Sequence, residues 1–115
     1  MERLWFAAIH SIDGLVAAWR GEAAFRQEVV LTVFLIPLAG WVAPNAISGA
    51  LMTGSILIVL IIELLNSAVE AVVDRTGLHH DNLAKKAKDT ASAAVLIALL
   101  NAAITWAIVL LSAIA

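Results

Sequence analysis

The chain has no cysteine and few charged residues among its 115 positions. Without cysteine it has no disulfide framework, no thiol nucleophile and no thiolate metal site. Its six glycines are scattered and no G-x-x-x-x-G-K-[ST] sequence occurs, so P-loop and Rossmann nucleotide sites are excluded. Charged residues make up only 14% of the chain, and a net charge of −2 without a basic patch argues against nucleic acid as a partner.

Apolar residues dominate the amino-acid composition. They make up 63% of the chain, and the mean hydropathy is +0.98. So much apolar surface does not fit inside one small soluble core, whereas a bilayer accepts it. The composition therefore predicts a membrane protein, and the patterns described below lead us to expect an all-α fold that forms a single membrane domain.

The first segment, residues 1–20, has the pattern of an amphipathic helix. Apolar residues recur there at spacings of four, three, four and three: Trp5, Ile9, Ile12, Val16 and Trp19. The other face is polar and charged, so this helix is expected to lie along the membrane surface. Packing against a soluble partner is the alternative interpretation.

An uncharged run follows from Val29 to Ile62 and is too long for one membrane span. As a single helix its 34 residues would measure about 51 Å, against roughly 30 Å of bilayer hydrocarbon. Gly40, Pro44 and Asn45 supply a break. We therefore expect one span at about 23–43 and a second at about 46–72.

A third span is predicted near the end of the sequence. The run from residue 90 to residue 115 has no charge, which is enough for one tilted span at about 90–113. Between the second and third spans, residues 76–89 read as a cytoplasmic loop with a short helix. Asn101 falls inside the third span, where we expect an interhelical hydrogen bond rather than a ligand contact.

The charges predict how the chain is oriented. All seven basic residues lie in the N-terminal segment or between Arg75 and Lys88, and the turn at Pro44 has none. The positive-inside rule therefore places both of these regions in the cytoplasm. All nine acidic residues lie on that same side, so the ionisable groups are concentrated at one membrane surface.

The second span ends in a row of polar side chains. On a helix, Asn66, Ser67, Glu70 and Asp74 fall within roughly 60° of Glu63. An ionisable group at membrane depth costs at least about 2.5 kcal/mol, so such a row is a candidate site. The alternative is a helix end that reaches the interface with its acids solvated.

Carboxylates without cysteine favour a hard cation. Mg²⁺ is commonly held by one or two carboxylates together with substrate phosphates. Phosphoryl transfer fits this inventory, because it needs a metal, a cation on the phosphates and a base near the attacking hydroxyl. The residues alone thus predict metal-dependent chemistry at the cytoplasmic membrane surface.

Three segments in this order, 22–28, 63–75 and 87–95, closely resemble the prokaryotic diacylglycerol kinase family. The resemblance implies a homotrimer of three-span subunits with a surface helix, in the bacterial cytoplasmic (inner) membrane. Such an enzyme transfers the γ-phosphate of ATP to a lipid hydroxyl and, with diacylglycerol, gives phosphatidic acid. Undecaprenol is the alternative acceptor, since both alcohols present one hydroxyl on apolar chains.

The resemblance also implies roles for individual residues. Glu63 is the catalytic base, and Glu22 and Glu70 hold Mg²⁺. The implied nucleotide contacts are Arg3, His10, Glu22, Glu70, His79, Asp81, Lys88 and Asp89. The implied substrate contacts are Arg3, Trp19, Arg26, Glu28, Glu63, Asn66 and Ser92.

The chain departs from the usual family pattern at its predicted nucleotide contacts. Phe6 stands where a lysine is common, and His10 replaces a usual tyrosine. The turn after Arg75 has His79 and Asp81 where the family usually carries an acid and then a histidine. The resemblance is therefore weakest for the contact with the base of the nucleotide.

Two functions from other classes remain as alternatives. A small oligomeric proton-coupled transporter would also use an intramembrane glutamate, but it requires acids near the midplane with access from both sides. A non-catalytic membrane scaffold gives no reason for the combination of Glu63, Asn66, Glu70, Lys88 and Asp89.

Overall fold

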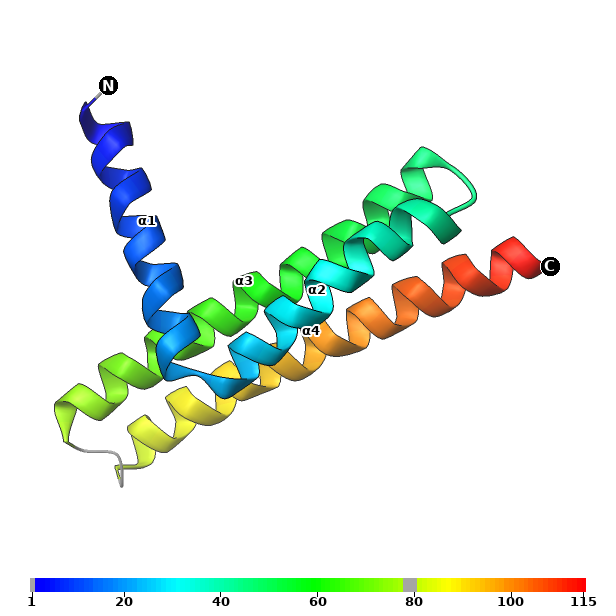
Figure 1. The fold of residues 1–115 in the computed structure, drawn as a ribbon. Coiled ribbons are helices and arrows are strands. Elements are labelled where there is room, and N and C mark those ends of the chain that lie inside the picture. Colours follow the sequence, from blue (N-terminus) through cyan, green and yellow to red (C-terminus); the bar gives the residue numbers. More distant parts are fainter. Residues whose placement is uncertain (1, 78–80) are drawn as a thin grey trace.

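The computed structural model describes residues 2–77 and 81–115, which form four helices (Figure 1). These are α1 (Glu2–Gly21), α2 (Ala23–Val42), α3 (Ala46–Thr76) and α4 (Asn82–Ile114). These two ranges contain no strand. Among them, α2, α3 and α4 are long and apolar enough to cross a membrane. The predicted all-α membrane fold is therefore confirmed.

Helix α3 is the centre of the arrangement. Helices α2 and α4 pack along it, and α1 contacts α2 and α3. The N-terminal half of α1 projects away from the other three helices (Figure 1). This placement suits a helix that lies on the membrane surface while its neighbours cross the bilayer.

Buried apolar side chains form the contacts between the spans. Ala39, Met52 and Val109 make one buried cluster. The other combines Val59 of α3 with two alanines of α4, Ala98 and Ala102. Alanine lets two helix backbones approach closely, which drives packing in lipid, where hydrophobic burial gives no net gain.

The break between the first two spans falls at residues 43–45, within the predicted Gly40–Asn45 region. Asn45 caps α3, because its side-chain oxygen accepts a hydrogen bond of 2.8 Å from the Ser48 backbone N–H. Trp41 lies beside the turn and is 85% exposed, as an interfacial anchor would be.

The other two spans extend well beyond the bilayer core. With 31 and 33 residues, α3 and α4 measure about 46 and 50 Å, against roughly 30 Å of hydrocarbon. Helix α4 begins at Asn82, so residues 82–89 are its first turns and not a separate short helix. Gly77 ends α3 in the left-handed conformation, with φ +70°. The C-terminal end of α3 and the N-terminal end of α4 carry the charged residues of these two helices.

Candidate active site

The polar row on α3 becomes less buried along the helix. Glu63 is only 9% exposed, and Asn66, Ser67 and Glu70 are half-buried. Asp74 is exposed at the helix end. From Glu63 to Asp74 the helix rises about 16 Å, so the row leads from membrane depth to the aqueous surface.

Glu22 joins this row from a distant part of the sequence. It is the single residue between α1 and α2, with an extended backbone of φ −125° and ψ 109°. Its Oε1 accepts a hydrogen bond of 3.2 Å from the hydroxyl of Ser67, which lies 45 residues away. Ser67 and Glu70 are three residues apart on α3, so this bond holds the carboxylate of Glu22 on the side of α3 that carries Glu70.

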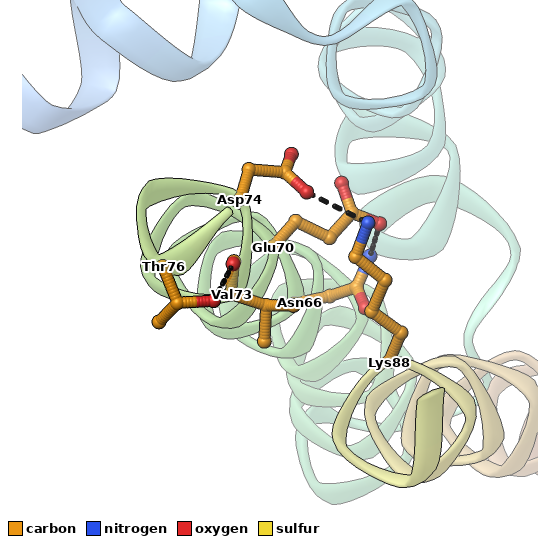
Figure 2. Close-up of polar contacts among 6 residues, drawn as sticks. All are labelled: Asn66, Glu70, Val73, Asp74, Thr76 and Lys88. Atoms are coloured by element: carbon orange, nitrogen blue, oxygen red, sulfur yellow. Dashed lines mark hydrogen bonds and ion pairs between the residues drawn. The ribbon is translucent and has the colours of Figure 1, made fainter. Parts of the chain in front are cut away.

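Asn66 positions the second carboxylate. Its Nδ2 donates a hydrogen bond of 3.2 Å to Oε1 of Glu70, and Figure 2 shows the two side chains meeting beside α3. The amide oxygen Oδ1 of Asn66 is buried, and it has no hydrogen-bond partner in the described part of the chain. An unmet buried acceptor costs about 1–3 kcal/mol, so this oxygen favours binding of a donor such as a hydroxyl group.

Glu28 on α2 and Glu63 on α3 lie close enough for their side chains to interact directly. Oε2 of Glu28 is buried and has no hydrogen-bond partner within residues 2–77 and 81–115. Two neighbouring carboxyl groups repel each other when both are ionised, so the pair favours an added proton or a nearby cation. Glu63 therefore lies beside a second carboxyl group at the buried end of the row.

Lys88 crosses from α4 to α3. Its Nζ lies 2.7 Å from Oδ1 of Asp74, as Figure 2 shows. The other predicted nucleotide contact nearby, Asp89, pairs with Lys85 on its own helix. Exposed ion pairs of this kind are worth about 1 kcal/mol or less, so phosphate groups can compete for Lys88.

Arg26 links α2 to the end of α1. Its Nη1 donates to the backbone oxygens of Trp19 at 2.7 Å and Arg20 at 3.3 Å. These carbonyls belong to the last turn of α1, where no intrahelical donor is available. Beside this link, Trp19, Arg26 and Leu31 line a shallow apolar hollow. Such a surface suits contact with a lipid.

Other predicted contacts are not brought to the carboxylates within one chain. Arg3 and His10 are exposed on α1, and Arg3 lies 19 residues before Glu22, about 28 Å along the helix. Ser92 is exposed one turn beyond Lys88, and Asp81 is exposed just before α4. His79 lies outside the described residues.

The carboxylates of Glu22 and Glu70 fit a metal ion whose remaining ligands are phosphate oxygens. The described ranges contain no cluster of three or more His, Cys, Asp or Glu residues that could hold a metal alone. Glu22 and Glu70 are each hydrogen-bonded through Oε1, which leaves Oε2 of each for a cation. Mg²⁺ typically takes one or two carboxylates and completes its shell with phosphate and water oxygens. The donor set therefore fits Mg²⁺ in company with a nucleotide.

Two side chains in the site were not assigned a role from the sequence. Ser67 and Asp74 belong to the predicted polar row, but their partners, Glu22 and Lys88, were not predicted. The available signal was their spacing of seven residues, which places them two turns apart on the face that carries Glu70. Identifying the partners required the packing of α2 and α4 on α3.

Comparison with known proteins assigns the chain to a family. A family model described as prokaryotic diacylglycerol kinase matches residues 9–110. The chain belongs to the prokaryotic diacylglycerol kinase family. Every predicted site residue except Arg3 lies inside the matched range of this kinase family, and the resemblance found in the three sequence segments is confirmed.

Similar proteins cover nearly the whole chain. The diacylglycerol kinase of Escherichia coli (strain K12) is 50% identical over 110 residues, which span 96% of this chain and 90% of that protein. The diacylglycerol kinase of Pseudomonas aeruginosa is 49% identical over 111 residues, with the same two coverages. That of Helicobacter pylori (strain 26695) is 44% identical over 105 residues, or 91% of this chain and 82% of that protein.

Proposed function

We propose that the chain is an ATP-dependent diacylglycerol kinase that produces phosphatidic acid. The names of its relatives support this activity. The structural observation that carries the proposal is the position of Glu63. This carboxyl group is buried at the membrane end of the polar row, while Glu22, Glu70 and Lys88 lie toward the aqueous end. A lipid hydroxyl and a nucleotide phosphate would therefore approach the row from opposite ends.

In the proposed reaction, the lipid hydroxyl oxygen forms a bond to the γ-phosphorus of ATP. The bond from this phosphorus to the β–γ bridging oxygen breaks, and ADP leaves. Glu63 accepts the hydroxyl proton. Glu63 and Glu70 are seven residues apart, about 10.5 Å of helical rise, which leaves room for a phosphoryl group between them. Asn66 lies between the two and offers its free amide oxygen to the hydroxyl.

Glu22 and Glu70 would hold Mg²⁺ in this proposal. When bound, the ion neutralises charge on the phosphates and on the leaving group. Ser67 and Asn66 orient the two carboxylates through one hydrogen bond each. Lys88 exchanges Asp74 for a phosphate oxygen, which turns an ion pair within the chain into a contact with the nucleotide.

The proposal places this site at the cytoplasmic face of the bacterial inner membrane, in a homotrimer. The asymmetric distribution of charge supports that side, because the ends of α3 and α4 near residues 76–89 carry the basic residues. The remaining nucleotide contacts come from Arg3, His10, His79, Asp81 and Asp89. Trp19, Arg26, Glu28 and Ser92 contact the lipid substrate.

Phosphoryl transfer by the purified protein in lipid vesicles tests this proposal. The protein is given ATP labelled in the γ-phosphate, with Mg²⁺, and either diacylglycerol or undecaprenol. We expect label in phosphatidic acid, and none when Mg²⁺ is chelated. Preferential labelling of undecaprenol would identify the alternative acceptor. No transfer to either alcohol by correctly folded protein would overturn the assignment as a lipid kinase.

A further inference from the structure

Phe6 is the one large apolar residue of α1 that lies on the charged face of this helix. At about 100° per residue, the other large apolar residues fill an arc of about 140° around α1: Leu4, Trp5, Ile9, Ile12, Leu15, Val16 and Trp19. The ionisable residues fill a separate arc of about 100°: Glu2, Arg3, His10, Asp13 and Arg20. Phe6 falls inside this charged arc, between Asp13 and His10, and about 60° from the nearest member of the apolar arc.

The ring of Phe6 is open to water. The residue is 56% exposed, and the N-terminal half of α1 projects away from the other three helices (Figure 1). When the apolar arc rests on the membrane surface, the charged arc faces the aqueous phase, and Phe6 faces it as well. The membrane surface that receives Trp5 and Trp19 therefore does not cover this ring.

The two helical neighbours of Phe6 distinguish it from an isolated exposed side chain. Single apolar residues are common on protein surfaces. Here Arg3 precedes Phe6 by three residues and His10 follows it by four, so a guanidinium, a phenyl ring and an imidazole lie on consecutive turns of one face. Aromatic rings and guanidinium groups both stack on the π-face of a nucleic-acid base. The row formed by Arg3, Phe6 and His10 therefore combines groups that bind a planar base.

The nucleotide of the proposed reaction lies within reach of this row. In the proposed function, Arg3 and His10 contact the nucleotide, and Glu22 holds the Mg²⁺ that is shared with its phosphates. Phe6 lies 16 residues before Glu22, about 24 Å along the helix. A glutamate side chain, the ion, an extended triphosphate, the ribose and the base, placed end to end, bridge a separation of this order. The base can therefore reach Phe6 while the phosphates are held at Glu22.

We propose that the ring of Phe6 stacks on the base of the nucleotide. The inference rests on the proposed function and assigns a residue to the base contact, for which the family resemblance is weakest. A stack far from the reacting phosphate is equally strong in the ground state and in the transition state. It therefore lowers the KM for ATP and leaves kcat unchanged. Phe6 is a binding residue for the nucleotide and takes no part in the chemical step.

Steady-state kinetics of Phe6→Leu in lipid vesicles test the proposal on the full chain. Leucine keeps an apolar side chain at this position but removes the ring. We expect the KM for ATP to rise roughly 5- to 140-fold, the loss of one base stack, at constant kcat. Phe6→Trp should restore the KM. Trp5→Leu is the matched control, because Trp5 is 67% exposed on the same turn but lies in the apolar arc. An unchanged KM in Phe6→Leu, or an equal rise in Trp5→Leu, would overturn the proposal.

Inorganic tripolyphosphate separates a contact with the base from a contact with the phosphates. This compound has the phosphates of ATP without ribose or base, and it is used as a competitive inhibitor of the kinase reaction. Its inhibition constant should be the same in Phe6→Leu and in the unmodified protein. A rise equal to that of the KM for ATP would show that Phe6 acts on the phosphates or on the structure of α1, and would overturn the proposal.

A second measurement locates the base without turnover. The protein is illuminated with an azidoadenine analogue of ATP and Mg²⁺ in the absence of a lipid acceptor, and the labelled peptides are identified by mass spectrometry. We expect adducts within residues 3–10 that excess ATP prevents, and adducts confined to other segments would overturn the proposal. Kinase assays on the same preparations separate the two hypotheses. An active kinase labelled elsewhere overturns only the base contact, whereas folded protein without phosphoryl transfer overturns the proposed function.

Discussion

Replacement of Ser67 by alanine tests how the carboxylate of Glu22 is held for Mg²⁺. The change removes the hydroxyl that donates to Oε1 of Glu22 at 3.2 Å and leaves the backbone of α3 unaltered. Hydrogen bonds to charged groups are worth about 1.5–3 kcal/mol, and the length and partial exposure of this bond favour the low end. Because about 1.4 kcal/mol corresponds to a factor of ten, we expect roughly tenfold weaker Mg²⁺ binding in Ser67→Ala.

The assay is a Mg²⁺ titration of the initial rate at saturating ATP and diacylglycerol. Binding of Mn²⁺, measured by electron paramagnetic resonance with a non-hydrolysable ATP analogue, gives the same affinity without turnover. Ser11→Ala is the control, because the Ser11 hydroxyl bonds to the backbone oxygen of Ala7 on its own helix, at 2.8 Å, and to no carboxylate in residues 2–77 and 81–115. It should leave both measurements unchanged.

A double-mutant cycle identifies the partner of the Ser67 hydroxyl. If the hydroxyl acts by holding Glu22, then Ser67→Ala should have little further effect once Glu22→Gln is present. Magnesium dependence in Ser67→Ala equal to that of the unmodified protein would refute the reasoning. A loss that is fully additive to Glu22→Gln would show that Ser67 acts through another group.

Three further predictions concern the base, the lysine and the topology. Glu63→Gln should lower kcat by about 10²-fold or more while ATP binding stays within a few-fold of normal; near-normal turnover would remove Glu63 from the mechanism. Asp74→Asn frees Lys88 and should lower the KM for ATP by up to about fivefold, the value of an exposed ion pair; a raised KM would mean that Asp74 aids binding. Asn45→Cys should react with an impermeant maleimide from outside and Asn82→Cys only from the cytoplasm, and labelling of both from one side contradicts the three-span topology.

Periodicity and length were sufficient to predict the architecture. The uncharged run from Val29 to Ile62 exceeds the bilayer thickness, so a break near Pro44 was required, and the structure has it at residues 43–45. The polar row on α3 also followed from 3.6 residues per turn. Both features are local, because they depend only on how one segment is spaced along its own helix.

Contacts between helices could not be predicted from the spacing of residues along the sequence. Arg26 donates to the carbonyl of Trp19 because the chain turns at Glu22, and no side-chain pattern encodes that angle. The bond between Ser67 and Glu22 likewise depends on how α2 packs on α3. The short helix predicted within residues 76–89 was not joined to the third span, because its charged turns differ in hydropathy from the apolar run that follows, whereas α4 is continuous from Asn82.

The junction at Glu22 couples the tilt of α1 to the position of a carboxylate in the site. Glu22 is the one residue without helical conformation between α1 and α2, so a change in the tilt of α1 pivots at the backbone of a carboxylate proposed to bind the metal. The bonds from Arg26 to the end of α1 and from Ser67 to Glu22 resist that rotation. Lateral pressure or curvature in the leaflet that lifts α1 would thus be felt directly at the catalytic centre. The rate of such an enzyme would then respond to the mechanical state of the membrane as well as to substrate concentration.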